Sequence, residues 1–170
     1  DSAMVVLTTD GYIKRMPSDT FRTQERGGKG VLGLDTKDED SVKRVFSANL
    51  HDNLLFFTSS GRVFRMKTYD IPESSRTSKG QSVVNFLSLN TEEKVAQVLA
   101  LKSKGKDCKY LVMVTEKGII KKVEISDFEN IRSSGLIAIK LKEKDTLKWV
   151  LCSQGDSEIM LISGNGQSIR

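Results

Sequence analysis

The amino-acid sequence predicts an all-β fold made of repeated four-stranded units. A strand, a glycine turn and a second strand recur four times along the 170 residues. No stretch keeps the 3.6-residue apolar period of a helix over several turns. Hydrophobic residues make up 38% of the chain and charged residues 29%, which is the balance of a folded domain rather than a disordered one.

Each predicted hairpin has the same design. The four copies read "VVLTTDGYIKR" (5–15), "LFFTSSGRVFR" (55–65), "VMVTEKGIIKK" (112–122) and "MLISGNGQSIR" (160–170). A glycine in each turn supplies the positive φ of a tight hairpin at no steric cost. These turn glycines are Gly11, Gly61, Gly118 and Gly166. A cation follows each of them by four residues, as Arg15, Arg65, Lys122 and Arg170.

Two further apolar segments complete each unit. A second glycine (Gly30, Gly80 or Gly135) opens "VLGL" (31–34), "SVVNFLSL" (82–89) and "LIAIKL" (136–141), where we expect a third strand. A fourth strand is expected in "SVKRVFS" (41–47), "KVAQVLAL" (94–101) and "LKWVLCS" (147–153). Asn90 or Thr91 could cap a short helical turn before 94–101, but the β-branched residues there and the match to the other units favour a strand.

The spacing of the units is typical of propeller-type arrays. The hairpin glycines follow one another at intervals of 50, 57 and 48 residues, and four short strands in roughly 50 residues is the propeller period. We place the units at 4–53, 54–108 and 109–157, with the start of a fourth at 158–170, all within one domain (1–170). About three units would make an odd closed propeller. We therefore expect a segment of a larger array, cut from a longer polypeptide or completed by another copy.

Positive charge is concentrated between the hairpin glycine and the loop glycine. The formal net charge of the chain is +5. This segment holds five cations against two acids in each of the first two units, and three against three in the third. When the first two units are aligned on their hairpin glycines, Arg26 matches Arg76 and Lys29 matches Lys79. Cations that recur at one place in each unit would form a stripe, which suits the phosphate backbone of duplex DNA.

The loop "ERGGKG" (25–30) fits such a role. Glycines beside the cations would let phosphates approach backbone N–H groups without a Cβ in the way. The alternative interpretation is a surface loop whose glycines satisfy turns and whose cations are solvated.

Residues 11–34, "GYIKRMPSDTFRTQERGGKGVLGL", resemble the stretch that holds the gyrase A-box in the C-terminal domain of DNA gyrase A. The box pattern is Gln-Arg-Arg-Gly-Gly-Lys-Gly, and residues 24–30 agree with it at six of seven positions, with Glu25 in place of an arginine. The resemblance implies a β-pinwheel, usually of six blades, with strands exchanged between neighbours. It also implies that DNA bends around a basic rim and that the box is required for wrapping and negative supercoiling.

The alignment and the resemblance together indicate a set of DNA-binding residues. They are Lys14, Arg15, Arg22, Gln24, Arg26, Gly27, Gly28, Lys29, Gly30, Arg62, Arg65, Arg76, Lys79, Lys122 and Arg132. The implied partners are duplex DNA, the remainder of gyrase A, and gyrase B in an A2B2 assembly. The implied parent is a bacterial, ATP-dependent type IIA topoisomerase in the cytoplasm, associated with the nucleoid. ATP hydrolysis and strand cleavage would lie in its other domains, with no cofactor in this segment.

Signals for catalysis, metal binding and membrane insertion are absent from the sequence. His51 is the only histidine and lies in the turn "LHDN", where we expect a surface side chain rather than a base or a zinc ligand. "RGGKG" lacks the spacing of a P-loop. Cys108 and Cys152 stand outside any Cys-x-x-Cys pattern and favour reduced thiols, although their 44-residue separation leaves a bridge open. No apolar run approaches the ~18 residues that span a membrane.

The aromatic residues are predicted to pack. We expect Phe56, Phe57, Phe64 and Trp149 in the core of the blades, and Tyr12, Tyr69 and Tyr110 as packing residues rather than a DNA-cleaving nucleophile. Two alternatives to a gyrase domain remain at this point. One is the related domain of topoisomerase IV, which usually has fewer blades and lacks an intact box. The other is a propeller that binds a protein partner.

Overall fold

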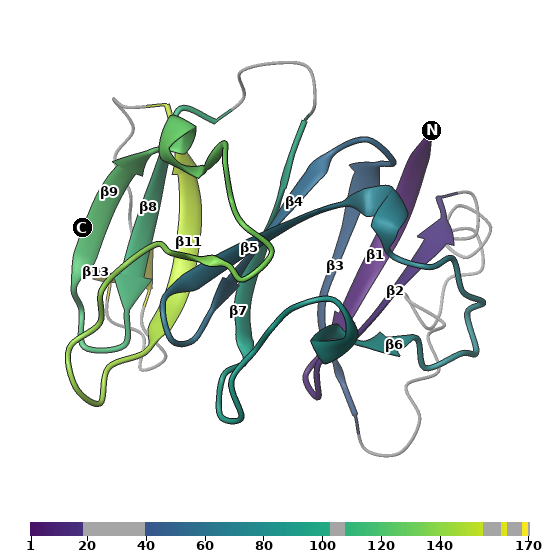
Figure 1. Cartoon of the computed structure of the whole chain (residues 1–170), viewed down its shortest axis with the longest axis horizontal. Coiled ribbons are helices and arrows are strands. Elements are labelled where there is room, and N and C mark those ends of the chain that lie inside the picture. Colours follow the sequence, from purple (N-terminus) through teal and green to yellow (C-terminus); the bar gives the residue numbers. More distant parts are fainter. Residues whose placement is uncertain (19–39, 103–107, 155–160, 163–167, 170) are drawn as a thin grey trace.

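The structure, a computed structural model, is built from antiparallel sheets and confirms the all-β prediction. It describes residues 1–18, 40–102, 108–154, 161–162 and 168–169. Three sheets stand side by side, and each is built around one of the repeated hairpins (Figure 1). Three short 3₁₀ turns connect strands: η1 (Thr68–Asp70), η2 (Val83–Asn85) and η3 (Ile125–Phe128).

Each sheet is defined by its strands and their order. The first sheet runs β3-β1-β2-β6 and contains β1 (Ser2–Thr8), β2 (Tyr12–Pro17), β3 (Val42–Asn49) and β6 (Gln81–Ser82). The second runs β10-β5-β4-β7 and contains β4 (Asn53–Thr58), β5 (Arg62–Lys67), β7 (Val95–Leu101) and β10 (Leu136–Ile137). The third runs β11-β8-β9 and contains β8 (Tyr110–Thr115), β9 (Ile120–Glu124) and β11 (Leu147–Ser153). A separate pair joins β12 (Leu161–Ile162) and β13 (Ser168–Ile169).

The repeated hairpins form as predicted. Gly11, Gly61 and Gly118 have φ values of +88°, +85° and +87°, and the N–H of each donates to the carbonyl of the threonine three residues earlier. That buried threonine (Thr8, Thr58 or Thr115) also accepts, through Oγ1, the N–H of the residue after the glycine, at 3.0 to 3.1 Å. Gly166, the fourth turn glycine, lies outside the described residues.

Neighbouring units exchange a strand. β6 follows the hairpin of the second unit but pairs with β2 of the first sheet, and β10 of the third unit pairs with β5 of the second sheet. This exchange confirms what the family resemblance implied. The predicted length of the third strand was wrong, because β6 and β10 are two residues each. The apolar residues that follow leave the ladder and fill the space between sheets, where Val83, Ala138 and Ile139 are buried.

Two loop glycines allow this exchange, because their backbone lies too close to the neighbouring unit to leave room for a Cβ. Gly80 and Gly135 have φ values of +87° and +86°. A Cβ on Gly80 would lie 2.5 Å from the carbonyl oxygen of Ile13, and one on Gly135 would lie 2.9 Å from the ring of Phe64. Both glycines are therefore packing positions between units. The glycines that we expected to open the backbone to phosphates, Gly27, Gly28 and Gly30, lie outside the described residues.

The middle sheet is buried on both faces. Leu54 and Phe56 of β4 pack into the core shared with the first sheet, whereas Leu55 and Phe57 pack into the core shared with the third. Because successive side chains of a strand point to opposite faces, this double burial explains the continuous apolar run "LLFF". Phe56, Phe57 and Phe64 are core residues as predicted.

Two packing expectations were wrong, and the cysteines are not the reduced thiols that the sequence favoured. Trp149 is 41% exposed, because the register of β11 shifts after Leu147, so that Leu147 and Val150 face the core and Trp149 does not. Tyr69 is 49% exposed in η1, where its ring meets His51 edge-on. Cys108 and Cys152 form a disulfide with their Cα atoms 5.4 Å apart, since the pairing of β8 with β11 brings them together. His51 is exposed in its turn, as expected. No helix among the described residues is long and apolar enough to cross a membrane.

The energetic effect of the close approach between units can be tested by comparing the free energies of unfolding of two variants, each with alanine at a glycine of similar φ. A Cβ at Gly118 would meet nothing within 4 Å, whereas a Cβ at Gly61 would lie 2.3 Å from the carbonyl oxygen of Ile139. Gly118→Ala should therefore cost about 1–2 kcal/mol for the left-handed backbone alone. Gly61→Ala should cost clearly more, because the exchanged segment must move. Urea unfolding monitored by circular dichroism gives both values, and equal losses would contradict the close packing.

Candidate nucleic-acid interface

The loop at 73–80 is the second unit's counterpart of the predicted DNA-binding loop, and it lies against β2 of the first sheet. Ser74 N–H donates to the carbonyl of Arg15 at 2.9 Å, and Glu73 forms an isolated bridge with the same residue. Arg76 is exposed. Lys79 is half-buried, with its Nζ 4.0 Å from the centre of the Tyr12 ring. The strand exchange therefore holds two aligned cations at the surface of the neighbouring sheet.

The buried side chain of Lys14 holds the backbone of this loop. Its side chain is 4% exposed, and its Nζ donates to the carbonyls of Ser75, Arg76 and Ser78 at 3.1, 2.7 and 2.8 Å. The prediction that Lys14 contacts DNA does not fit this burial. The structure instead makes Lys14 the residue that fixes the path of the basic loop.

The cations four residues after the hairpin glycines also hold the following unit. Arg15 Nε donates to the carbonyl of Ile71 at 2.8 Å, and its side chain is 16% exposed, with Glu73 at 3.9 Å. Arg65 Nη1 donates to the carbonyl of Glu129 in the third unit, and Arg65 stays exposed. Arg15 and Arg65 therefore both donate to a backbone carbonyl of the following unit, a role that the sequence did not indicate. Of these two arginines, only Arg65 is exposed.

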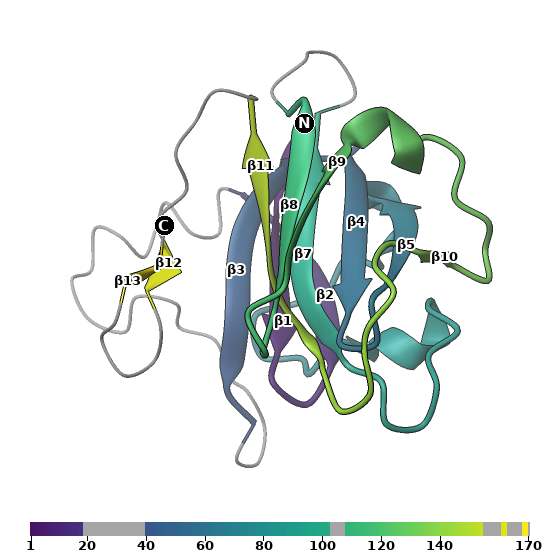
Figure 2. The same ribbon diagram turned by 90° about the vertical axis from the view of Figure 1, so that its left-hand side faces the viewer.

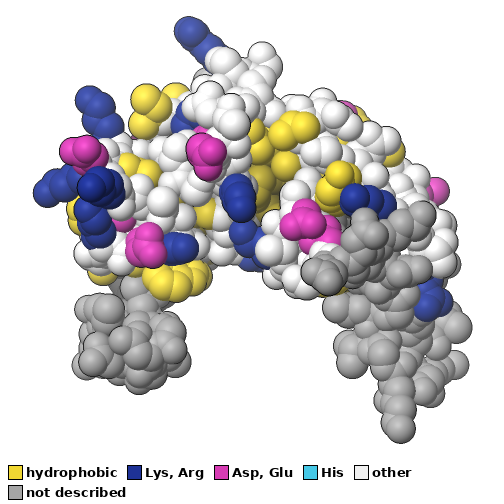
Figure 3. All heavy atoms as spheres, turned by 90° about the horizontal axis from the view of Figure 1, so that it is seen from below, with side chains coloured by type: hydrophobic (Ala, Val, Ile, Leu, Met, Phe, Trp, Pro, Cys, Tyr) yellow, Lys and Arg dark blue, Asp and Glu magenta, His cyan; other side chains and the backbone are white. Residues whose placement is uncertain are grey.

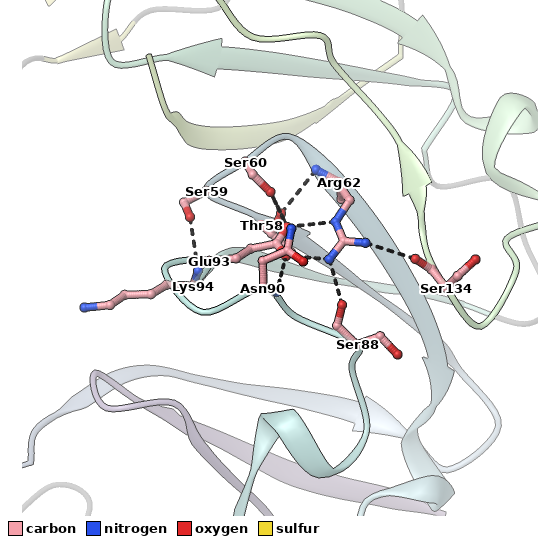
Figure 4. Close-up of polar contacts among 9 residues, drawn as sticks. All are labelled: Thr58, Ser59, Ser60, Arg62, Ser88, Asn90, Glu93, Lys94 and Ser134. Carbon is pink, nitrogen blue, oxygen red and sulfur yellow. Dashed lines mark hydrogen bonds and ion pairs between the residues drawn. The ribbon is translucent and has the colours of Figure 1, made fainter. Parts of the chain in front are cut away.

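Arg62 is half-buried and belongs to a polar network around the buried Glu93 (Figure 4). Its guanidinium donates to the Glu93 carboxylate at 3.0 and 2.5 Å and to the carbonyls of Ser88 and Ser134 at 2.7 and 3.1 Å. The Glu93 side chain is 1% exposed. The hydrogen bond from Arg62 to Glu93 raises the pKa of the guanidinium. Because all three nitrogens of Arg62 are engaged, the prediction that it binds DNA does not fit the structure.

Glu93 stays ionised despite its burial. Desolvation would raise the pKa of this carboxyl, but hydrogen bonds from Arg62, Ser60, Thr58 and the Asn90 N–H lower it to about 2. Thr58 Oγ1 lies at 2.5 Å and the Asn90 N–H at 3.0 Å. The carboxylate therefore joins the hairpin turn of the second unit to the loop before β7.

A buried acid recurs in each unit, and sequence reasoning missed it. Asp40 accepts the Asp10 N–H at 2.9 Å, and Asp145 accepts the N–H groups of Lys117 and Thr146 at 3.0 and 2.9 Å. Burial raises the pKa of Asp145, but hydrogen bonds from Thr115, Lys117 and Thr146 hold it below its usual value. The signal was present, because Asp40, Glu93 and Asp145 each stand two residues before the fourth strand of their unit.

The other predicted residues fall into two groups. Lys122 on β9 is exposed, with its Nζ 4.4 Å from the centre of the Tyr110 ring, and Arg132 is exposed in the loop before Gly135. A second group lies outside the described residues: Arg22, Gln24, Arg26, Gly27, Gly28, Lys29 and Gly30.

The exposed cations of the predicted DNA-binding set share one edge of the sheets. Arg65 and Lys122 lie on the second hairpin strands, β5 and β9, and Arg76 lies in the loop that leads to β6. The sheet orders place β3, β7 and β11 at the opposite edge, and Figure 2 shows β3 and β11 on one side of the molecule with β5 and β10 on the other. At that opposite edge lies an open cavity of about 490 Å³, whose lining includes Lys94 and Lys148.

A family model described as DNA gyrase C-terminal domain, beta-propeller, matches residues 3–49, 52–102 and 109–154. The chain belongs to this family. Each of its three matched segments contains one of the repeated hairpins, β1–β2, β4–β5 or β8–β9.

Similar proteins and structures agree with this assignment. The chain is 45% identical over 170 residues to the DNA gyrase A protein of Mycolicibacterium smegmatis and 43% identical to that of Clostridium acetobutylicum. In both cases it spans its whole length but only 20% of the relative. A solved C-terminal domain of DNA topoisomerase IV has a TM-score of 0.77 at 26% identity, over 99% of this chain and 51% of that one. A solved DNA gyrase A C-terminal domain has a TM-score of 0.75 at 26% identity, over 99% and 53%.

The stability of the chain should depend on pH through Glu93. Its folded pKa of about 2 lies below the value of an unfolded glutamate, so the unfolded state binds more protons as pH falls. Stabilisation by this carboxylate is complete above about pH 5 and is lost towards pH 2, a difference of about 2–3 kcal/mol. Glu93→Gln should lower stability at pH 7 and flatten the profile in this window. Denaturant unfolding at several pH values measures both.

Glu92→Gln is the matched control, because Glu92 is the exposed neighbour of Glu93. It should leave both the stability at pH 7 and the pH profile unchanged. A Glu93→Gln profile as steep as that of the parent chain would show that other groups cause the acid loss.

Proposed function

We propose that the chain binds duplex DNA without base preference and bends it around the edge formed by the second hairpin strands and the loops that follow them. It would do so as the C-terminal domain of a gyrase A protein that supports negative supercoiling. The observation that carries this proposal is the recurrence of exposed cations (Arg65, Arg76, Lys122 and Arg132) at one edge of consecutive sheets in a member of the gyrase C-terminal family.

Electrostatics at such an edge can offset the stiffness of DNA. Smooth bending of a 20–30 base-pair site costs about 1–6 kcal/mol. Each neutralised phosphate releases condensed counterions, which gives affinity that does not depend on sequence. Histones hold bent DNA in this way, with arginines at regular intervals and no base-specific contacts. A repeated fold suits this task, because equivalent cations follow one another at the spacing of the blades.

The gyrase A-box is the second part of the proposal. Residues 24–30 align with 74–80 on the hairpin glycines, so Arg26 and Lys29 correspond to Arg76 and Lys79. We infer that Arg22, Gln24, Arg26 and Lys29, with Gly27, Gly28 and Gly30, form the strongest DNA contact of the chain. Glu25 in place of an arginine reduces the positive charge of the loop by two relative to the box pattern.

We infer the parent protein from the relatives. Because the chain spans a fifth of the length of the gyrase A sequences that it matches, we propose that it is one domain of a bacterial type IIA topoisomerase. In that protein gyrase B completes an A2B2 assembly in the cytoplasm, and the ATPase and cleavage sites lie in other domains. The solved structures that it resembles are about twice its length, which supports a larger array of about six blades.

A topoisomerase IV domain is the second candidate. The solved topoisomerase IV domain is as close in fold as the gyrase domain, with TM-scores of 0.77 and 0.75. The sequence relatives and the six matching box residues favour gyrase. A propeller that docks a protein partner would not need aligned cations, and its weak DNA binding would not fall steeply with salt.

Replacing the rim cations should reduce the salt dependence of DNA binding. Arg76→Gln with Lys79→Gln should weaken binding to random-sequence duplexes to a similar extent for every sequence. It should also lower the slope of log affinity against log salt by about 2, because each phosphate contact contributes about 0.9. Fluorescence anisotropy between low and moderate salt gives the slope.

Lys94→Gln with Lys148→Gln is the charge-matched control, because both lysines are exposed at the opposite edge. It removes the same two charges and should leave the slope unchanged. Equal effects of the two double variants would mean that DNA responds to net charge alone, which contradicts a defined rim.

The box makes a separate prediction about bending. Arg26→Ala with Lys29→Ala should reduce DNA bending, measured by fluorescence energy transfer across a labelled duplex, much more than it reduces the free energy of unfolding. A parallel loss of bending and stability would identify the loop as structural.

A further inference from the structure

The three sheets meet around a cavity that the proposed function does not use. It measures about 490 Å³ and is lined by residues from β3, β7 and β11, with the turns beside them. Five of these residues matter for its chemistry: Lys43, Arg44, Lys94, Lys148 and Trp149. Figure 3 shows the described residues curving into an arch, with Lys and Arg side chains at the centre of the view.

The cavity concentrates positive charge without a compensating acid. No Asp or Glu is among its lining residues in the described part of the chain. Lys43 Nζ donates to the carbonyl of Val95 at 2.6 Å, which joins the first sheet to the second. Partial burial lowers the pKa of Lys43, and the neighbouring charges of Lys148 and Lys94 lower it further. Like charges held together in this way are stabilised by a bound anion.

The cavity also has an aromatic wall and an apolar floor. Trp149, the only tryptophan of the chain, is 41% exposed and forms the aromatic wall. Leu7, Val98 and Leu147 contribute buried apolar side chains to the floor. An exposed indole beside several cations can stack on a planar ring while the cations hold charged groups. Lysine binds phosphate as a compact point charge, and three lysines converge here.

We propose that this cavity binds a compact, multiply charged phosphate anion of nucleotide size. Its phosphates would lie among Lys43, Lys94 and Lys148, and a base, where present, would stack on Trp149. The volume lies within the 300–1,000 Å³ range of small-molecule sites. The occupant would touch all three sheets and hold them together.

Trp149 provides the readout, since its fluorescence reports only on this site. The chain is titrated with sodium tripolyphosphate and, separately, with ATP, and calorimetry checks each affinity. Both ligands should bind saturably. Tighter binding of ATP would identify a nucleotide site, and equal binding would identify a site for the oligophosphate alone. Both outcomes support the phosphate chemistry.

Matched variants decide whether the lysines carry the binding. Lys94→Gln with Lys148→Gln should weaken tripolyphosphate binding at least tenfold. Their side chains form no ion pair among the described residues, so the fold should be kept. Lys140→Gln with Lys142→Gln removes the same charge from exposed lysines outside the cavity and should change the affinity less than twofold.

Three results would overturn the proposal. One is the absence of saturable binding by a folded chain, and another is equal weakening by the two double variants. The third is equally tight binding of a hexaglutamate peptide, which would show a site for any polyanion. Failure of this proposal would not affect the proposal of DNA binding. DNA binding is tested separately by the salt slope of the Arg76 and Lys79 variant, for which the Lys94 and Lys148 variant is only the control.

Discussion

The close approach of each unit to the hairpin before it is the constraint on which the structure depends. Gly80 lies against the Ile13 carbonyl and Gly135 against the Phe64 ring, and neither site has room for a Cβ. Each exchanged segment therefore crosses to the neighbouring sheet at a fixed place. The loop at 73–80 reaches β2 by this route, where its carbonyls accept from Lys14 and its Ser74 N–H donates to the carbonyl of Arg15. Packing between units thus determines where the surface cations lie.

The cations consequently divide into two kinds. Buried or clamped cations such as Lys14 and Arg62 satisfy carbonyls and a carboxylate inside the fold, where loss of a partner would leave a buried polar group unpaired. Exposed cations such as Arg65 and Arg76 lie at one edge of the sheets, and Lys94 and Lys148 lie at the other. A net charge of +5 therefore conceals cations that hold the fold together and cations that stay exposed at two different edges.

Local chemistry made much of the fold predictable, and tertiary contacts account for the rest. The hairpins could be predicted because a glycine with positive φ is a local requirement, and β7 because a β-branched run matched the other units. Lys14 could not be distinguished from a surface cation, since its partners come from residues 61 to 64 positions later. Trp149 was misplaced because a register shift decides its direction. The buried acid of each unit stands at the same distance before the fourth strand in all three units, but its burial and its hydrogen bonds are known only from the structure.

The most direct test of the account is whether the chain imposes a handed path on DNA. A relaxed circular plasmid is incubated with the chain, treated with a nicking-closing topoisomerase and freed of protein, and its topoisomers are separated by gel electrophoresis. DNA bent along a curved edge of twisted sheets should shift the linking number in one direction, in proportion to the amount of chain bound. Binding without any shift in the topoisomer distribution would contradict wrapping around the rim.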